Sequence, residues 1–396
     1  MSEKFFGGIS LVTGTSIGAA ALALPVVASS LGVLGTFFCF LLCWAVMYFA
    51  GLMVLEVSVA CGSEKSFISM AQQTLGDSYK WLITFLYLIL LYSLLGAYFS
   101  GGADLVHSFF RLFKYDNSIS YFIEILPFVL VTSLVMCAGK RSLDYLNRAM
   151  VIGILVTFFM LLISLLRFVD FENIRYNLDL GSIGTLKLLP VIITAFGYQV
   201  VIPSLRNYLA DDVKVLPKVI LIGSLIPFFL YLFWSILIYL LLPLSGDFSI
   251  TSLKAGLSPI DDLPYYLNHI YKSKIMTNCL NLFSFFALSS SVLGIAVSLF
   301  DFLADRLMYG YLKFTRMAII FLTLFPPFIF TLFYPQGFIF ALSFAGFFVA
   351  ILNGIIPVMM FYKHRIKNDI AISYTEYGSM LLVTLVSLAI LLAMLL

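Results

Sequence analysis

The stretch Thr13-Gly-Thr-Ser-Ile-Gly-Ala-Ala-Ala-Leu-Ala-Leu-Pro25 places two glycines, three hydroxyl side chains and a proline in the first long apolar run of the chain. Glycine costs a helix about 1 kcal/mol relative to alanine, and hydroxyl side chains compete for backbone hydrogen bonds. Proline removes a backbone donor. We therefore predict that the helix is interrupted here. In lipid, an interrupted backbone is tolerated only where it faces protein or a water-filled cavity.

A second stretch of this kind, Ala195-Phe-Gly-Tyr-Gln-Val-Val-Ile-Pro-Ser204, lies in the sixth apolar run. The two stretches are five spans apart, so their helices run in opposite directions across the bilayer. Interrupted helices at matching places in two halves indicate the binding site of an inverted-repeat transporter. Gly14 and Gly18 alone could equally form a G-x-x-x-G packing face, and the second stretch favours the transporter interpretation. We predict that residues near 14–18 and 196–199 lack continuous helical hydrogen bonding and face one another.

The overall composition indicates a protein embedded in a membrane. Of the 396 residues, 62% are hydrophobic and 11% are charged, and the mean hydropathy is +1.06. A soluble domain has about 45–50% apolar and about 25% charged residues, so this chain cannot build a water-soluble surface. The net charge of +3 gives no basis for nucleic-acid binding. The five cysteines form no C-x-x-C pair, and we expect no metal centre and no cofactor.

Eleven apolar windows are long enough to cross the hydrocarbon core, which takes about 20 helical residues. We interpret the first window as a span rather than a cleaved leader, because it continues past Pro25 without a clean cleavage site. Lysine and arginine are more numerous on the segments that a cytoplasmic N-terminus places inside. We therefore expect a cytoplasmic N-terminus and a C-terminus on the opposite side. The windows are residues 5–30, 34–60, 80–106, 121–138, 146–168, 187–207, 217–243, 275–304, 317–334, 336–361 and 374–396.

These spans predict one transmembrane domain over residues 1–396. Repeat one would occupy about 5–168 and repeat two about 187–361, with an added eleventh helix at 374–396. The outer connection 244–274 is longer than the usual link between helices. It could be a lid over a pathway or a solvated surface loop, and the sequence leaves both interpretations open.

The interruptions suggest how a zwitterion would bind. Backbone amides at the start of a half-helix carry partial positive charge and suit a carboxylate, whereas the carbonyls at opposite ends suit an ammonium group or a cation. Phe196 and Tyr198 flank the second interruption, and Tyr92 and Tyr98 lie on the third span at a depth that could reach it. Rings there could stack on an aromatic ligand, each pair adding about 0.5–1.5 kcal/mol beyond burial.

Further motifs accompany the two interruptions. Ala287-Leu-Ser-Ser-Ser-Val-Leu-Gly294 runs into Phe300-Asp-Phe-Leu-Ala-Asp305, and Tyr334-Pro-Gln-Gly-Phe338 forms a later turn. With the first and sixth spans, this set resembles the hydroxy/aromatic amino acid permease family, which includes the bacterial tyrosine and tryptophan permeases. The resemblance covers nearly the whole chain. The tyrosine permeases, and the chlamydial members in particular, are most similar.

The resemblance implies an all-α membrane protein with the LeuT-like fold of the amino acid/polyamine/organocation superfamily: eleven helices, a five-plus-five inverted repeat, and discontinuous first and sixth helices. It implies import of tyrosine or tryptophan across the bacterial inner membrane by cation symport and alternating access. The substrate site expected from the resemblance and from the two interruptions comprises Thr15, Ser16, Ile17, Gly18, Ala19, Tyr92, Tyr98, Phe196, Gly197, Tyr198 and Gln199.

Two positions depart from the commoner family pattern. Ala19-Ala-Ala21 replaces a glycine-methionine version of the first-span motif, and Gln199 stands where relatives often have a histidine. Gln199 keeps hydrogen-bonding ability but cannot titrate. These departures bear on specificity rather than on the fold.

The coupling ion is a proton or sodium. Ser290 and Ser291 match a hydroxyl pair that holds sodium in sodium-coupled carriers of this fold, although serines also pack helices closely. Proton coupling needs a titratable group inside the membrane. The family is usually described as proton symporters, and we expect a proton. The candidate coupling residues are Gly14, Ser290, Ser291, Glu56 and Asp104, with Asp301 and Asp305 as further carboxylates that could equally be interfacial.

Other classes of function are disfavoured. A channel needs a continuous polar lining, and the polar interruptions here are isolated. A membrane enzyme needs a catalytic constellation, and no H-E-x-x-H or G-x-S-x-G motif occurs. A sodium-coupled carrier of other neutral amino acids is the remaining alternative. We expect an amino acid and the lipid bilayer as partners, with no obligatory protein partner.

Overall fold

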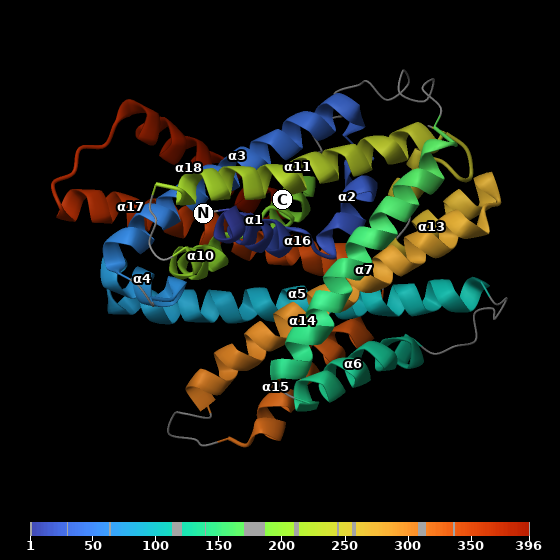
Figure 1. Cartoon of the computed structure of the whole chain (residues 1–396), viewed down its shortest axis with the longest axis horizontal. Coiled ribbons are helices and arrows are strands. Elements are labelled where there is room, and N and C mark those ends of the chain that lie inside the picture. Colours follow the sequence, from blue (N-terminus) through green and yellow to red (C-terminus); the bar gives the residue numbers. More distant parts are fainter. Residues whose placement is uncertain are drawn as a thin grey trace.

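The computed structural model describes residues 2–29, 31–62, 65–112, 121–138, 140–169, 187–209, 214–243, 245–255, 259–307, 314–335 and 337–395, and these residues form helices and no strands (Figure 1). Ten helices in these ranges are long and apolar enough to cross a membrane. A bent pair near the N-terminus raises the count to eleven if the pair is one span. Each span coincides with a predicted window. The all-helical membrane class is therefore confirmed.

The first span is broken, as predicted. Helix α1 (Ser2–Ser16) and helix α2 (Ala20–Ala28) meet at an angle of 60°. The interruption lies at residues 17–19, slightly later than the predicted 14–18, because the Ile17 amide still bonds the Thr13 carbonyl at 2.9 Å. Helix α1 therefore continues to Ser16, and beyond the break the Ala19 amide bonds a side chain of another helix.

The sixth span is broken as well. Helix α9 (Leu189–Thr194) is followed by four non-helical residues, a 3₁₀ turn η2 (Gln199–Val201) and helix α10 (Ile202–Tyr208). Pro203 lies in the first turn of α10. A backbone N–H at that position would have no acceptor within the helix, so proline removes no helical hydrogen bond there. The interruption thus falls on residues 195–198, close to the predicted 196–199.

Long helices surround the two broken spans. Helix α11 packs against α1, α2 and α3, and α9 packs against α2, α3 and α16. On the other side of the bundle, α5 and α14 pack against each other, and α14 also packs against α7 (Figure 1). The long helices are α3 (Gly32–Cys61), α5 (Asp77–Leu112), α6 (Tyr121–Ala138), α7 (Lys140–Leu166), α11 (Leu216–Leu241), α14 (Lys274–Leu307), α15 (Arg316–Phe333), α16 (Phe338–Val349), α17 (Ile356–Lys367) and α18 (Tyr374–Leu395).

The crossing of α9 and α16 depends on a glycine. A Cβ on Gly346 would lie 1.9 Å from the carbonyl oxygen of Pro190, so any side chain there would force the two backbones apart. The close approach fixes α9, the first half of the broken sixth span, against α16.

The long connection at 244–274 is largely helical where it is described. Helices α12 (Ile250–Ala255) and α13 (Pro259–Tyr271) pack against α2, and α13 also packs against α5 and α14. The apolar side chains that they bury are Ile250, Leu253, Ile260, Leu263 and Leu267. The solvated-loop interpretation is therefore wrong for these residues, since burial of a continuous apolar face holds them on the bundle.

The outward side of the bundle is apolar. Several large apolar side chains there are at least 59% exposed, an arrangement that water would disfavour and lipid would cover. This surface agrees with the membrane class. Examples are Trp81, Phe85, Leu134, Ile163 and Phe333.

An ion-pair network ties three helices at the end of the bundle where the chain begins. Arg365 on α17 donates from Nη2 to Glu56 on α3 at 2.7 Å and to Glu376 on α18 at 2.6 Å. Glu56, a predicted coupling candidate, is thus held as a partner of an arginine. The carboxylates are about one-third exposed and the arginine 13% exposed, so the network is stronger than a fully exposed pair and weaker than a buried one.

We expect Arg365→Met to lower the free energy of unfolding by about 1–2 kcal/mol, because it leaves two carboxylates without their cation. Thermal unfolding of the detergent-solubilised protein measures the effect. Lys367→Met is the matched control, since Lys367 is exposed on the same helix and outside the network. Equal stability of the Arg365 variant and the control would contradict a structural role for the network.

Candidate functional site

The first-span break leaves backbone amides without helical partners. The amides of Ala21 and Leu22 bond the carbonyls of Gly18 and Ala19, each at 3.0 Å, which tightens the start of α2. The Gly18 amide faces the Tyr231 hydroxyl, and the Ala20 amide has no acceptor in the described part of the chain. Both amides lie at the N-terminus of α2, where the partial positive charge of the helix end favours an anion.

Ser291 on α14 closes the break from one side. Its Oγ accepts a hydrogen bond from the Ala19 amide at 2.8 Å. A Cβ on Gly18 would lie 2.9 Å from the same oxygen, so the glycine is required for this contact. The predicted juxtaposition of Ser291 and the break is present, and Ser290 lies half-buried beside it on α14.

Tyr231 on α11 joins the two breaks and was missed by sequence reasoning. Its hydroxyl donates to the Ser16 carbonyl at 2.6 Å. Its ring packs edge-on against Phe196, with centroids 5.6 Å apart, and Phe196 packs likewise against Phe40 at 6.2 Å. These rings form a buried aromatic wall beside the first-span break. The only signal in the sequence was a tyrosine in mid-span, far from either membrane interface.

The sixth-span break satisfies its own amides. Those of Ala195, Phe196 and Gly197 bond carbonyls three residues earlier, at 3.2–3.3 Å. The Tyr198 amide bonds the Gln199 side-chain oxygen at 3.0 Å. The carbonyls of Phe196 and Gly197 accept no hydrogen bond from the described residues. This break therefore offers acceptors, whereas the first break offers donors.

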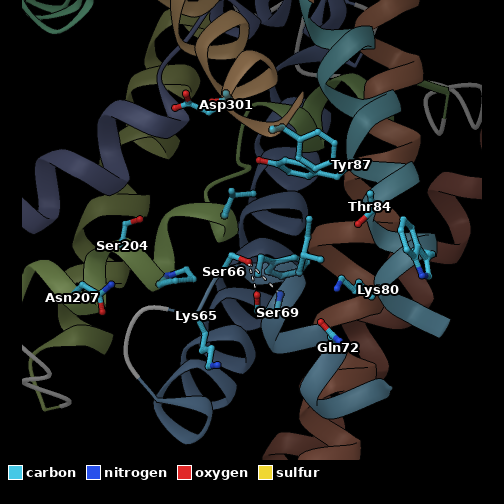
Figure 2. Close-up of a pocket in the computed structure, with 17 residues that line it drawn as sticks. Lys65, Ser66, Ser69, Gln72, Lys80, Thr84, Tyr87, Ser204, Asn207 and Asp301 are labelled. Atoms are coloured by element: carbon cyan, nitrogen blue, oxygen red, sulfur yellow. Dashed lines mark hydrogen bonds between the residues drawn. The ribbon is translucent and has the colours of Figure 1, made fainter. Parts of the chain in front are cut away.

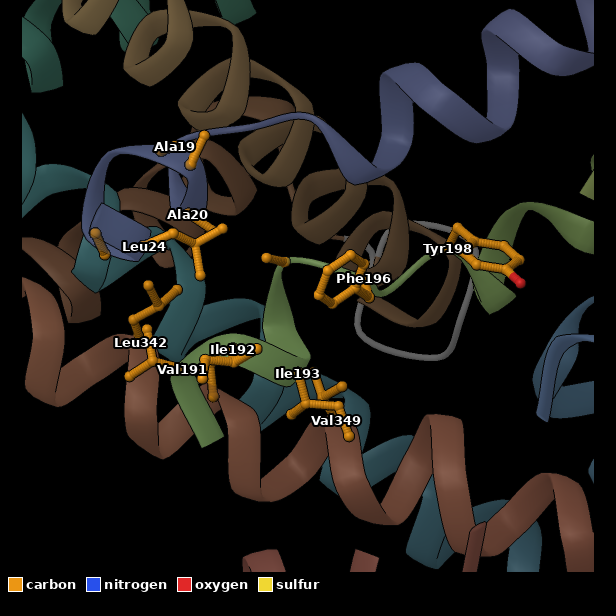
Figure 3. Packing of buried hydrophobic residues seen from close by; sticks show 14 of the residues in the cluster. Ala19, Ala20, Leu24, Val191, Ile192, Ile193, Phe196, Tyr198, Leu342 and Val349 are labelled. Carbon is orange, nitrogen blue, oxygen red and sulfur yellow. The ribbon is translucent and has the colours of Figure 1, made fainter. Parts of the chain in front are cut away.

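Tyr198 and Gln199 lie against α3 rather than against the first-span break. The Gln199 amide donates to the Met47 carbonyl at 2.9 Å, and the Tyr198 hydroxyl also reaches that carbonyl, at 3.4 Å. A Cβ on Gly51 would lie 2.7 Å from the Tyr198 hydroxyl. In Figure 3, Phe196 lies nearer to Ala19 and Ala20 than Tyr198 does. The structure thus brings Phe196 to the first break, through its contact with Tyr231, but not these two side chains.

The two tyrosines of the third span, Tyr92 and Tyr98, lie against different neighbours. Tyr98 is buried, 8% exposed, and near enough to Tyr231 for their hydroxyls to interact electrostatically. Tyr92 instead donates to the Leu322 carbonyl of α15 at 2.8 Å. The structure does not bring Tyr92 to the breaks, because period 3.6 places residues six apart on different faces of α5.

The predicted residues that precede the break lie in regular helix. The hydroxyls of Thr15 and Ser16 bond carbonyls four residues earlier, at 2.7 and 3.2 Å. Gly14 has open space where a Cβ would stand, so the described neighbours of Gly14 do not form a G-x-x-x-G packing face. Ile17 is half-buried within the break itself.

The carboxylate candidates lie apart from the breaks. Asp104 is buried near the far end of α5. One turn further along, His107 pairs with Glu124 on α6 at 2.7 Å, a buried carboxylate that sequence reasoning did not single out. Asp301 lines a cavity that also contacts α4 (Phe67–Leu75) and α10, and the Asp305 side chain lies outside the described residues.

A polar cavity of about 850 Å³ lies at the end of the bundle where the chain begins (Figure 2). It reaches Val200, directly after the sixth-span break, and Ser298, about 10 Å along α14 from Ser291 at 1.5 Å per residue. In Figure 2, Ser204 and Asn207 lie on one wall, and Lys80 and Thr84 lie on the other.

The opposite end of the bundle is packed. All residues of α2 are buried, under α12 and α13, and the Tyr239 hydroxyl bonds the Ala28 carbonyl at the end of α2. Among the described residues, a cavity therefore lies on one side of the two breaks and buried helices lie on the other.

The break at Gly18 gives a direct test of the site. We expect Gly18→Leu to lower substrate uptake roughly tenfold or more, equivalent to about 1.4 kcal/mol or more, because the side chain displaces Ser291 and occupies the space at the amides. Insertion should be normal, since leucine is favourable in lipid. Gly14→Ala, which meets open space, is the control. Uptake by reconstituted protein, normalised to inserted protein, measures both, and normal uptake by Gly18→Leu would contradict the site.

Comparisons with known proteins identify the family of the chain. The model of the tryptophan/tyrosine permease family matches residues 1–396. The chain is 30% identical to tyrosine-specific transport system 1 of Haemophilus influenzae, over 97% of this chain and 94% of that protein. It is 29% identical to a tryptophan-specific transport protein of Pseudomonas aeruginosa, over 90% and 85%.

A relative named for a different substrate also matches: glutamine transporter 2 of Aliivibrio fischeri is 27% identical over 76% of this chain and 75% of its own length. The match of the family model to the whole chain decides the class. The chain is a membrane permease rather than an enzyme, and it belongs to the tryptophan/tyrosine permease family.

Proposed function

We propose that the chain imports tyrosine or tryptophan across the bacterial inner membrane by cation symport and alternating access. The observation that carries the proposal is the meeting of two broken spans, one with backbone amides at a helix N-terminus and the other with carbonyls that accept no hydrogen bond from the described residues, beside a buried aromatic wall. The names of relatives 29–30% identical to the chain support the substrate class. The membrane-spanning architecture supports the location.

The proposed binding mode follows from the polarity of the breaks. The substrate carboxylate accepts hydrogen bonds from the amides of Gly18 and Ala20 at the N-terminus of α2. The ammonium group donates to the carbonyls of Phe196 and Gly197. The aromatic side chain packs on the rings of Phe196 and Tyr231, which makes stacking available to tyrosine and tryptophan but not to aliphatic amino acids.

The proposed architecture is the five-plus-five inverted repeat. Spans one to five and six to ten each begin with a broken helix, and α18 is added outside the repeats. The N-terminus is cytoplasmic in this proposal, because lysine and arginine are enriched at that end. The cavity of Figure 2 is then the cytoplasmic vestibule, and α12 with α13 closes the periplasmic side.

The proposed coupling ion is the proton, with sodium as the alternative. Sodium would need Ser291, whose Oγ is directed at the first-span break and bonds the Ala19 amide. A proton would need a buried carboxylate. Asp104 serves this role better than Glu56, because Asp104 is buried within α5 whereas the Glu56 carboxylate is one-third exposed.

Uptake into proteoliposomes tests the function. We expect labelled tyrosine or tryptophan to accumulate under an inward proton gradient. Unlabelled tyrosine, tryptophan and phenylalanine should compete more strongly than leucine, alanine or glutamine, because only the first three fill an aromatic wall. Glutamine is the informative competitor, since one relative carries that name. Equal competition by alanine or glutamine would overturn the aromatic assignment.

The substitution Ser291→Ala separates the two ions. If sodium binds between α14 and the first-span break, loss of one oxygen ligand raises the sodium concentration for half-maximal uptake. Under the proposed proton coupling, the dependence on the pH gradient stays as in the unmodified protein even where the rate falls. Ser164→Ala on α7, whose hydroxyl bonds the Leu161 carbonyl of its own helix, is the control. A sodium requirement shifted only by Ser291→Ala would refute proton coupling.

A further inference from the structure

The tenth span is not a uniform α-helix. Between α16 and α17 it contains a π-helical turn, η3 (Ala350–Ile355). The sequence gives a local cause, because Pro357 lacks the N–H that would bond the Asn353 carbonyl four residues earlier. Single π turns inside long helices frequently occur at functional sites. The polar side chain in this turn is Asn353.

Asn353 in this turn is directed at the sixth-span break. Its side-chain nitrogen lies 3.4 Å from the place that a Cβ on Gly197 would occupy, so the glycine lets the amide approach the backbone of the break. The side chain is 4% exposed, and its Oδ1 has no hydrogen-bond partner in the described part of the chain. A buried amide oxygen without a donor is unfavourable. It indicates a donor that arrives in another state of the protein.

Ser387 on α18 lies behind the same turn. A Cβ on Gly354 would lie 2.2 Å from the Ser387 Oγ. Ser387 is fully buried, and its Oγ also lacks a partner among the described residues. The Ser387 hydroxyl thus faces Gly354, the residue that follows Asn353 in the turn. Donation from Ser387 to Asn353, directly or through a water, would satisfy both.

We propose that Asn353 is a positioning residue for the sixth-span break and that Ser387 orients it. In the substrate-bound state, the Asn353 N–H donates to a carbonyl of the break, Phe196 or Gly197, and Ser387 donates to its Oδ1. The bond fixes the direction of the carbonyls that receive the substrate ammonium. The eleventh span, which lies outside the two proposed repeats, thereby acts on substrate affinity. This inference rests on the proposed function.

Four variants test the proposal: Asn353→Leu, Ser387→Ala, the double variant, and Thr323→Val as a control. Thr323 is equally buried and polar, but it lies on α15 and bonds only its own helix. The readouts are KM and maximal rate of labelled tyrosine uptake into proteoliposomes, and the stabilisation of the purified protein by added tyrosine in thermal unfolding.

Asn353→Leu should raise KM about tenfold, with the maximal rate nearly unchanged. Ser387→Ala should raise KM about threefold, and the double variant should match Asn353→Leu because the serine acts through the asparagine. Thr323→Val should leave KM unaltered. A purely structural role would lower the yield of folded protein without this non-additivity.

Two failures are distinguishable. If the unmodified protein transports tyrosine and Asn353→Leu leaves KM unchanged, or if the two single effects multiply, the inference is wrong and the proposed function stands. If the unmodified protein transports no aromatic amino acid and gains no stability from tyrosine, the proposed function itself fails.

Discussion

The structure depends on how a backbone can lose its helical hydrogen bonds inside a membrane. In the bilayer core no water replaces a missing partner, so every interrupted residue needs another donor or acceptor. The first-span break finds them on neighbouring helices, through the Ser291 oxygen at 2.8 Å and the Tyr231 hydroxyl at 2.6 Å. The sixth-span break finds them locally, through tight turns and the Gln199 side chain. These different solutions give the two breaks opposite polarity.

The sequence predicted the features that depend on local composition. Ten of the eleven apolar windows coincide with helices long enough to span, and the first became the bent pair α1 and α2, because crossing the hydrocarbon sets a length that hydropathy measures directly. Both breaks were predicted within a few residues, since glycine, hydroxyl and proline clusters weaken a helix wherever it packs. Ser291 was predicted to lie near the break only through the family resemblance. The alternatives left open for residues 244–274 were decided only by the buried apolar face of α12 and α13.

The sequence did not predict which neighbouring helix each side chain faces. Tyr92 and Tyr98 lie in similar sequence surroundings, but only Tyr98 lies near the breaks. The two residues are on different faces of α5, and these faces contact different helices. Tyr198 and Gln199 lie in the predicted stretch, yet they bond Met47 on α3. Tyr231 and Asn353 lie in apolar spans without any local motif. Each role arises from a helix brought close by packing, which hydrophobic periodicity alone does not encode.

The two halves of the sixth span are fastened to different neighbours. The backbone of α9 meets α16 at Gly346, and a Cβ on Gly7 of α1 would lie 2.2 Å from the Tyr208 hydroxyl at the end of α10. The contact at Gly346 joins two backbones, so rotation of a side chain cannot absorb a displacement of α9 against α16. The contact at Gly7 instead meets the tip of the exposed Tyr208 side chain, which can rotate. The first half of the sixth span is therefore held more firmly than the second, and the non-helical residues 195–198 link the two.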